Sequence, residues 1–332
     1  MTHRAALVSG TLFALAAGLM WGLVFVAPLM LPDYPAALLS FARYLAFGLI
    51  ALPIAWLDRA QLARLSRADW REALKLSTVG NLLYYLFLAA AIQRAGGPLP
   101  TMIIGTLPVV IAVTSNLRQS HHVRQRDGRL PWARMAPSLA LIAGGIGLVN
   151  HVEITHLRAS AATSLAQYAV GALLALGAVG CWTWYPLRNA DWLRAHADRS
   201  PRTWATAQGL STLPLAALGF GGFWLWNTAS GQPFVMPLGP TPGLFVLLMF
   251  SIGLFASWLG TLCWNEASQR LPPALAGQLI VFETLSALAY AFVLRGQAPE
   301  ALTLVGVALL VAGVIWALRV RPEPLAAEAH AA

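Results

Sequence analysis

Two ionisable side chains lie deep inside apolar stretches of the sequence, where they could carry chemistry. Glu283 lies near the centre of the stretch 273–294, and Arg43 lies about eight residues into the stretch 35–57. A charge in an apolar interior is costly unless it is paired or hydrated, so such residues mark a functional site or a structural contact. Glu283 could exchange a proton or bind an ammonium group, or it could accept hydrogen bonds between helices. Arg43 could hold a substrate carboxylate through paired hydrogen bonds.

Aromatic and amide side chains inside the apolar stretches form a second set of candidates. Aromatic walls can stack on a flat apolar substrate, while the tyrosine hydroxyl and the tryptophan N–H supply polar contacts. Buried amides and hydroxyls need hydrogen-bond partners, so they could meet the groups of a zwitterion or join neighbouring helices. Helix packing is the competing interpretation of the aromatic residues. Together with Glu283, the candidate substrate-binding residues are Trp21, Asn81, Tyr84, Tyr85, Thr101, Trp182, Tyr185, Trp258 and Gln278.

The sequence contains none of the common catalytic or nucleotide-binding motifs. HExxH, GxSxG, GxxxxGK and CxxC are all absent. The seven histidines fall between the apolar stretches or in the tails, where they could not form a metal site at helical depth. We therefore expect no enzyme activity, no cofactor and no metal ion.

Ten apolar stretches would have to position these side chains. The 332 residues are 58% hydrophobic and 11% charged, whereas a soluble domain carries about 25% charged residues. About 20 apolar residues cross a hydrocarbon core about 30 Å thick, and helices satisfy their own backbone groups there. We predict an all-α polytopic membrane protein with ten transmembrane helices. The expected spans are 9–31, 35–57, 73–93, 99–117, 135–150, 165–187, 203–226, 243–264, 273–294 and 300–318.

The basic residues indicate how the chain crosses the membrane. With the N-terminus assigned to the cytoplasm, all but four of the 22 Lys and Arg residues fall in cytoplasmic connections. The opposite side carries Arg94, Arg158 and Arg295, and Arg43 lies within a span. Cytoplasmic loops of membrane proteins are enriched in Lys and Arg, so both termini are expected in the cytoplasm. Because the net charge of +9 is spread over short loops, we expect no nucleic acid partner.

The two halves of the chain share short patterns in the same order. Residues 17–21 in the first span correspond to 178–182 in the sixth, and 138–145 in the fifth correspond to 306–313 in the tenth. Five helices are an odd number, so the second half must enter the membrane in the opposite direction. The pattern predicts two inverted five-helix repeats around a central cavity, a plan common in secondary transporters. The expected units are 1–160 and 161–320, followed by a disordered cytoplasmic tail over 321–332.

Four runs of sequence resemble one known family. The runs 18–22 (GLMWG) and 35–44 (PAALLSFARY), in the first and second spans, are similar to the opening of the EamA-type repeat. The run 107–109 (LPV) in the fourth span and the ending 306–314 (GVALLVAGV) also fit this family. The resemblance covers nearly the whole chain and implies the drug/metabolite transporter superfamily. Within it, the chain most resembles the YddG-type aromatic amino acid exporters. Because this family carries an arginine at position 43 across many substrate classes, we favour a structural role for Arg43.

The resemblance implies a secondary transporter of the cytoplasmic (inner) membrane. It would export small amino-acid-like metabolites, aromatic amino acids first, by alternating access. The alternatives are an exporter of another amphiphile, such as a drug, a threonine-like amino acid or a purine, or a channel or membrane-embedded enzyme. The expected partners are the small solute and the lipid bilayer, with the protein a monomer or a weak homodimer. Few acidic residues lie within the spans, which predicts weak or no proton coupling.

Overall fold

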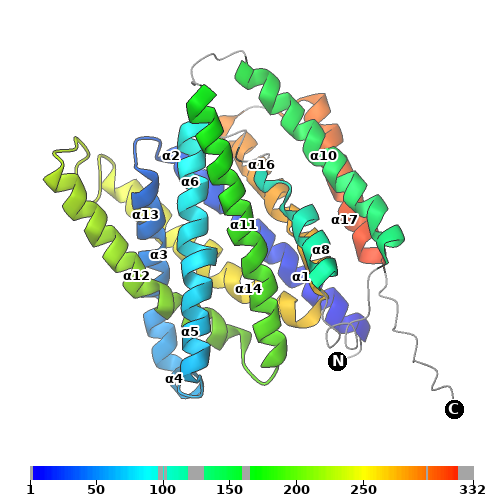
Figure 1. The fold of residues 1–332 in the computed structure, drawn as a ribbon, viewed down its shortest axis with the longest axis horizontal. Helices are drawn as coiled ribbons and strands as arrows, with labels where there is room; N and C mark the ends of the chain where they lie inside the picture. The colour runs from blue at the N-terminus through cyan, green and yellow to red at the C-terminus, as the bar shows by residue number, and fades with distance from the viewer. Residues whose placement is uncertain are drawn as a thin grey trace.

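The structure is a bundle of helices packed side by side (Figure 1). This computed structural model describes residues 3–95, 100, 103–118, 131–158, 165–296 and 298–320. Within these ranges all regular elements are helices, which satisfy their own backbone hydrogen bonds in an apolar surrounding. In chain order they are α1 (His3–Trp21), η1 (Gly22–Phe25), α2 (Val26–Met30), α3 (Ala36–Leu57), α4 (Arg59–Leu62), α5 (Arg67–Leu76), η2 (Ser77–Leu83), α6 (Tyr84–Ala95), α8 (Leu107–Arg118), α10 (Trp132–Arg158), α11 (Leu165–Ala195), α12 (Pro201–Ala229), α13 (Pro242–Ile252), η3 (Gly253–Leu259), α14 (Gly260–Arg270), α15 (Pro273–Leu279), α16 (Val281–Arg295) and α17 (Ala301–Arg319).

The described residues contain seven helical stretches that are long and apolar enough to cross a membrane. Two shorter apolar helices, Trp132–Leu148 and Ala301–Ala317, lie at the predicted spans 135–150 and 300–318. The predicted span 99–117 falls partly outside the described residues. The described residues are thus all-helical in their regular structure and consistent with a polytopic membrane protein, while the number of ten spans stays a prediction. The seven stretches are Ala5–Met30, Ala36–Leu57, Arg67–Ala95, Ala166–Ala195, Pro201–Ala229, Pro242–Arg270 and Leu275–Leu294.

Three of these long stretches contain an irregular turn. Ser77–Leu83 and Gly253–Leu259 are π-helical, and Gly22–Phe25 is a 3₁₀ turn. A π-helical turn inside an α-helix rotates the side chains that follow it and is frequent at functional sites. Asn81 and Ser257 lie within the two π-helical turns. The irregular backbone therefore sets the direction in which these two polar side chains point.

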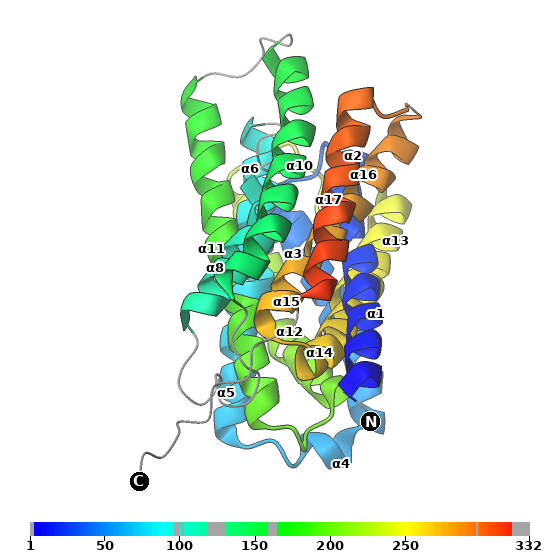
Figure 2. The same ribbon diagram turned by 90° about the vertical axis from the view of Figure 1, so that its right-hand side faces the viewer.

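Helices from the two halves of the chain pack in pairs. α3 lies on α12, α8 on α15 and α10 on α17, while α1 lies on α14 and α6 on α11. Figure 2 shows α10 beside α17. A Cβ on Gly145 of α10 would lie 2.6 Å from the carbonyl oxygen of Gly306 on α17, and one on Gly48 of α3 would lie 2.6 Å from the Cβ of Leu213. Glycine is needed at these positions because the backbones approach so closely.

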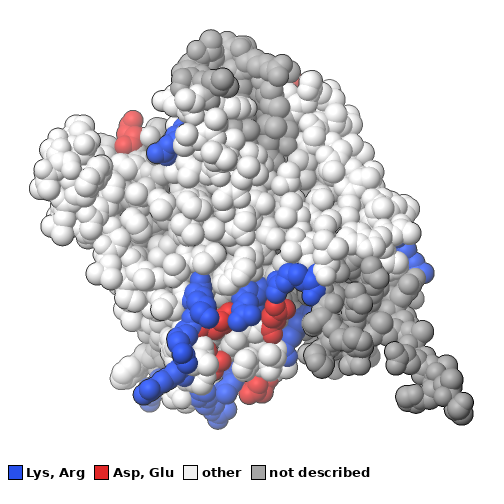
Figure 3. Space-filling view, in the orientation of Figure 1, with Lys and Arg blue, Asp and Glu red and all other residues white. Residues whose placement is uncertain are grey.

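Charged side chains gather at one end of the bundle (Figure 3). This end, called the charged end below, carries α4, α5, the last turn of α11 and the first turn of α12, and α1 begins there (Figure 1). Large apolar side chains are exposed on other parts of the surface, among them Leu173, Leu218 and Val293. An apolar surface of this extent is expected of a protein whose surrounding solvent is lipid.

Candidate functional site

A small cavity lies between helices of both halves of the chain. Its residues come from six of the seven membrane-competent stretches. The cavity has room for roughly one water molecule, about 10 Å³ for its centre. Five of the sequence-predicted site residues line it, namely Trp21, Asn81, Tyr84, Trp182 and Glu283. The other lining residues are Val24, Arg43, Tyr44, Ala256, Ser257 and Thr261.

Aromatic rings form one wall of this cavity. Trp182 stacks on Tyr84 and on Tyr185, with centroid distances of 4.6 Å and 5.0 Å and interplanar angles of 21° and 6°. Trp21 meets Trp182 edge-on at 5.2 Å. The two tryptophans that correspond between the halves of the sequence are therefore in direct contact. The Trp182 Nε1–H and the Tyr84 hydroxyl are buried and have no partner among the described residues.

Arg43 reaches the cavity from α3 and is held by two kinds of contact. Its Nε donates a hydrogen bond to Ser257 Oγ at 3.1 Å. Its guanidinium carbon lies 4.8 Å and 4.7 Å from the ring centroids of Tyr44 and Tyr85, within the range of cation–π contacts. Nη1 is buried and has no hydrogen-bond partner within the described part of the chain. The guanidinium is thus fixed in place while one donor group stays available.

Glu283 enters the same cavity from the first turn of α16. The residue is 4% exposed, and its Oε2 has no partner in the ranges that the structure describes. The backbone at this point packs tightly on α1, since a Cβ on Gly18 would lie 3.0 Å from the Glu283 nitrogen. Among the described residues that line the cavity, Arg43 is the only cation and Glu283 the only anion. One basic and one acidic side chain therefore line the cavity.

Two predicted tyrosines lie behind the lining of the cavity. The Tyr85 hydroxyl donates to the Val24 carbonyl oxygen at 3.4 Å, and its ring supports the Arg43 guanidinium. The Tyr185 hydroxyl donates to Gln208 Oε1 at 2.9 Å. Both tyrosines are fully buried, so they position residues of the cavity wall.

The three remaining predicted residues lie away from the cavity or outside the described residues. Trp258 faces α12, where its Nε1 donates to Thr206 Oγ1 at 3.3 Å. Gln278 is buried at the contact of α15 with α10, where its Oε1 lies 2.5 Å from Ser138 Oγ. Both side chains therefore make hydrogen bonds between helices, which is the alternative to substrate binding for buried polar residues. Thr101 lies outside the described residues.

Sequence reasoning did not select several residues that line the cavity. Ser257 and Thr261 are four positions apart, a spacing that places both on one face of a helix, and this signal was available. The structural role expected for Arg43 agrees with the hydrogen bond from its Nε to Ser257. It does not account for Nη1, which has no partner among the described residues. Apolar lining residues such as Val24 and Ala256 carry no distinguishing signal in a chain this apolar.

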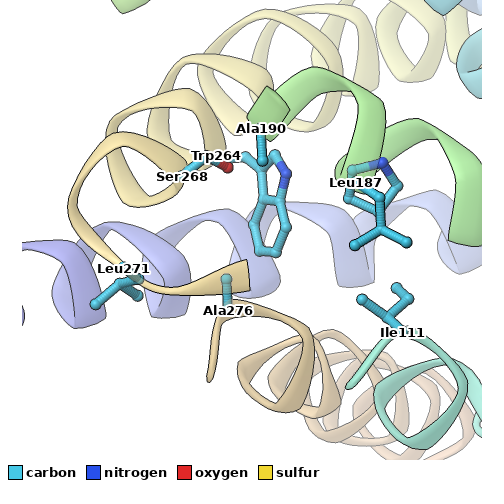
Figure 4. A pocket seen from close by; sticks show the side chains of 8 residues that line it. Ile111, Leu187, Ala190, Trp264, Ser268, Leu271 and Ala276 are labelled. Atoms are coloured by element: carbon cyan, nitrogen blue, oxygen red, sulfur yellow. The ribbon is translucent and has the colours of Figure 1, made fainter. Parts of the chain in front are cut away.

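A second, mostly apolar cavity lies next to the first, toward the charged end (Figure 4). Ser257 and Thr261 line the first cavity, and Trp264 and Ser268 follow along α14 to line the second. Trp264 and Trp21 contact each other at a centroid distance of 5.2 Å, so this pair stands between the two cavities. Figure 4 shows the side chains that converge on the second cavity, which come from α8, α11, α14 and α15 and from Leu271 just after α14. They are Ile111, Pro186, Leu187, Ala190, Trp264, Ser268, Leu271 and Ala276.

Beyond the second cavity, polar contacts fasten the charged end. Asp58 at the end of α3 accepts hydrogen bonds from Arg202 at 2.8 Å and from Thr203 at 2.5 Å. Glu72 of α5 pairs with Arg188 of α11 at 2.5 Å. These contacts join helices of the first half to helices of the second half. Asp58 and Glu72 are buried in these contacts, so the two halves are joined at this end by charge-assisted hydrogen bonds.

Comparison with known proteins gives the class of this chain. The model of the EamA-like transporter family matches residues 8–123. "Inner membrane protein YtfF" of Escherichia coli (strain K12) is 53% identical over 317 residues, which cover 96% of this chain and 97% of that protein. A relative this similar over its whole length, together with the apolar helices, supports a multi-pass protein of the inner membrane.

A solved structure shares the fold. A crystal structure, described only as that of a protein, superposes with a TM-score of 0.67 at 20% identity, over 93% of this chain and 97% of that one. The names of these two proteins include no substrate, so the narrower likeness to aromatic amino acid exporters stays a prediction. The residues of the cavity and the matching relatives lead to one conclusion: the chain belongs to the EamA-like transporter family.

Proposed function

We propose that this protein is a secondary transporter that carries a small amino-acid-like solute, most simply an aromatic amino acid, out of the cell. The observation that carries the proposal is the set of unpaired polar atoms at the central cavity. Of the eight buried side-chain atoms without a partner among the described residues, four belong to residues that line it. A solute with polar groups and a flat ring would meet the N–H and hydroxyl groups and the aromatic wall together.

Alternating access requires two arrangements of similar energy, which inverted repeats provide. If each helix of the predicted unit 1–160 is replaced by its counterpart in the unit 161–320, and the reverse, the main pairs of packed helices stay the same. The pairs α3 with α12, α8 with α15, and α10 with α17 map onto themselves, and α1 with α14 maps onto α11 with α6. The two π-helical turns also fall in corresponding spans. This pattern supports an inverted repeat, with the charged end and both termini in the cytoplasm.

The size of the cavity implies movement during transport. Space for about one water molecule is smaller than any amino acid. The wall can open where Tyr84 of α6 stacks on Trp182 of α11, since an inserted flat ring would replace one stacked contact with two. The Trp21–Trp264 pair would then separate the solute from the cavity nearer the charged end. The charged end is fastened by ion pairs, so this arrangement corresponds to a state closed to the cytoplasm.

Counterflow in proteoliposomes tests the proposal. Vesicles preloaded with unlabelled tryptophan, phenylalanine, threonine or buffer receive trace labelled tryptophan outside. Transient accumulation only with aromatic preload is the expected result. Accumulation with threonine preload would shift the substrate to amino acids in general, and no accumulation with any preload would leave another amphiphile such as a drug or purine. Flux that does not saturate indicates a channel, and a chemically altered product indicates an enzyme.

Transport direction and oligomeric state are parts of the same proposal. An alternating-access carrier can run in either direction, so the mechanism does not give the direction of transport. Export is proposed from the family resemblance. Gly145 of α10 and Gly313 of α17 pack tightly within one chain, which supports a functional monomer, whereas Gly147 of α10 has nothing within 4 Å of its Cβ and stays available for a weak homodimer. Labelled tryptophan loaded inside the vesicles should leave faster with unlabelled tryptophan outside, and cross-linking in the membrane reports the oligomeric state.

A further inference from the structure

We propose that the central cavity recognises both ends of a zwitterion, with the Arg43 guanidinium on the carboxylate and the Glu283 carboxylate on the ammonium group. The inference rests on the proposed transport function and specifies the class of its substrate, an α-amino acid with both groups free. The feature that carries it is the presence of one basic and one acidic side chain on one cavity, each with an unpaired polar atom among the described residues.

Arg43 is built as a receptor for an anion. The Nε hydrogen bond to Ser257 and the rings of Tyr44 and Tyr85 hold the guanidinium from three directions. Nη1 is left without a partner in the described part of the chain. A planar guanidinium presents its donors in a fixed fork that matches a carboxylate. Binding a carboxylate would therefore cost little further ordering of this side chain.

Glu283 is the complementary group for a cation. Its Oε2 is buried without a partner among the described residues, and its backbone is fixed where α16 packs against Gly18 of α1. An ammonium group carries three donors and no acceptor, so a carboxylate is its natural partner. The side chain comes from α16 and Arg43 comes from α3, so the two groups approach the cavity from different helices.

A purely structural ion pair would be arranged differently. If Arg43 and Glu283 served only to neutralise each other, Nη1 and Oε2 would be the atoms in contact, yet both lack partners within the described residues. A ligand with only one charge would pair one residue and leave the other buried and unpaired, which is costly. A zwitterion satisfies both residues and leaves the net charge of the cavity unchanged. Discrimination against singly charged analogues follows.

Competition among three ligands that share the indole ring tests the inference. Purified full-length protein in proteoliposomes is assayed for tryptophan counterflow with tryptophan, tryptamine or indole-3-propionate as competitor. Each analogue lacks one charged group, so each should compete at least about tenfold more weakly than tryptophan. Equal competition by all three would overturn the inference while leaving transport intact.

Two variants assign the charges to the residues. In Glu283→Gln, tryptophan should lose its advantage over indole-3-propionate and keep its advantage over tryptamine. In Arg43→Gln, the opposite pattern is expected, and Arg43→Lys should restore part of the discrimination against tryptamine. Glu266→Gln and Arg118→Gln, which change ion pairs on α14 and on the end of α8, are the matched controls and should leave the order of competitors unchanged.

The same ligands can be tested without transport. Thermal stabilisation of the purified protein in detergent should follow the order tryptophan, then the two analogues, and gel filtration shows whether each variant folds. If tryptophan neither binds nor moves but threonine does, and threonine loses its effect in both variants, the aromatic substrate is wrong and the zwitterion site stands. Variants that weaken all ligands by the same factor would overturn the assignment of Arg43 and Glu283.

Discussion

Gly80→Ala places one methyl group where the two halves of the chain meet beside the cavity. Gly80 lies in the π-helical turn η2, and a Cβ there would overlap the ring of Tyr185, coming within 2.8 Å of the Tyr185 Cβ and closer to Cγ and Cδ2. The tyrosine must move, although it stacks on Trp182 and donates to Gln208. Overpacking costs about 1–3 kcal/mol. The lost hydrogen bond adds ~1 kcal/mol, and the lost aromatic contact adds ~1 kcal/mol.

Better helix propensity of alanine returns about 1 kcal/mol, so Gly80→Ala should destabilise the protein by roughly 2–4 kcal/mol. Thermal unfolding of the purified protein in detergent should show a melting temperature lower by several degrees. Gly180→Ala on α11 is the control, because nothing lies within 4 Å of its Cβ, and it should be neutral or slightly stabilising. In the double variant Gly80→Ala/Tyr185→Ala the overlap is gone, so it should be at least as stable as Tyr185→Ala alone, with only the helix propensity of alanine added. Additive effects in the double variant, or a neutral Gly80→Ala, would refute the contact between η2 and Tyr185.

Three further predictions concern the transport cycle. Asp58→Asn weakens the ties at the charged end, so a cysteine placed at Ser268 in a cysteine-free background should react faster with a membrane-impermeant thiol reagent applied from that end; equal rates would show that these ties do not close it. Trp264→Ala removes the ring between the two cavities and should raise tryptophan efflux from loaded vesicles into buffer without tryptophan, whereas an unchanged efflux would place the barrier elsewhere. An imposed pH gradient alone should not drive tryptophan accumulation by the wild-type protein, because few acidic residues lie within the spans; accumulation that Glu283→Gln abolishes would instead make Glu283 the proton carrier.

The helices follow from composition, because a chain with so few charged residues satisfies its backbone groups in an apolar surrounding by forming long apolar helices. Seven of the predicted spans coincide with membrane-competent helices. The irregular turns could not be predicted from the sequence. Ser77–Leu83 and Gly253–Leu259 lie within long apolar stretches, and neither turn contains a proline. Their π-helical form arises from packing between helices, as at Gly80, which a linear pattern does not encode.

The site was partly predictable for a related reason. Glu283 and the corresponding Trp21 and Trp182 stand out by chemical type or by repetition, and all three line the cavity. Gln278 is equally conspicuous in the sequence, yet the structure gives it a partner on α10. Whether a buried polar side chain is paired depends on the neighbouring helix, and its residue type alone does not reveal that neighbour.

Hydrogen bonding is uneven along the bundle, and this contrast bears on mechanism. Toward the charged end, Tyr185, Gln208, Asn189 and Asn265 form a continuous chain in which each side chain donates to the next at 2.8–3.1 Å. At the cavity, by contrast, four buried polar atoms have no partner among the described residues. Each unpaired buried group costs about 1–3 kcal/mol. Trp264 and Ser268, which line the second cavity, also carry an atom each that is unpaired within the described part of the chain, so the uncompensated groups follow the two cavities while the amides of Gln208, Asn189 and Asn265 are paired. Such a cost is sustainable at the cavities if a solute repays it during each cycle.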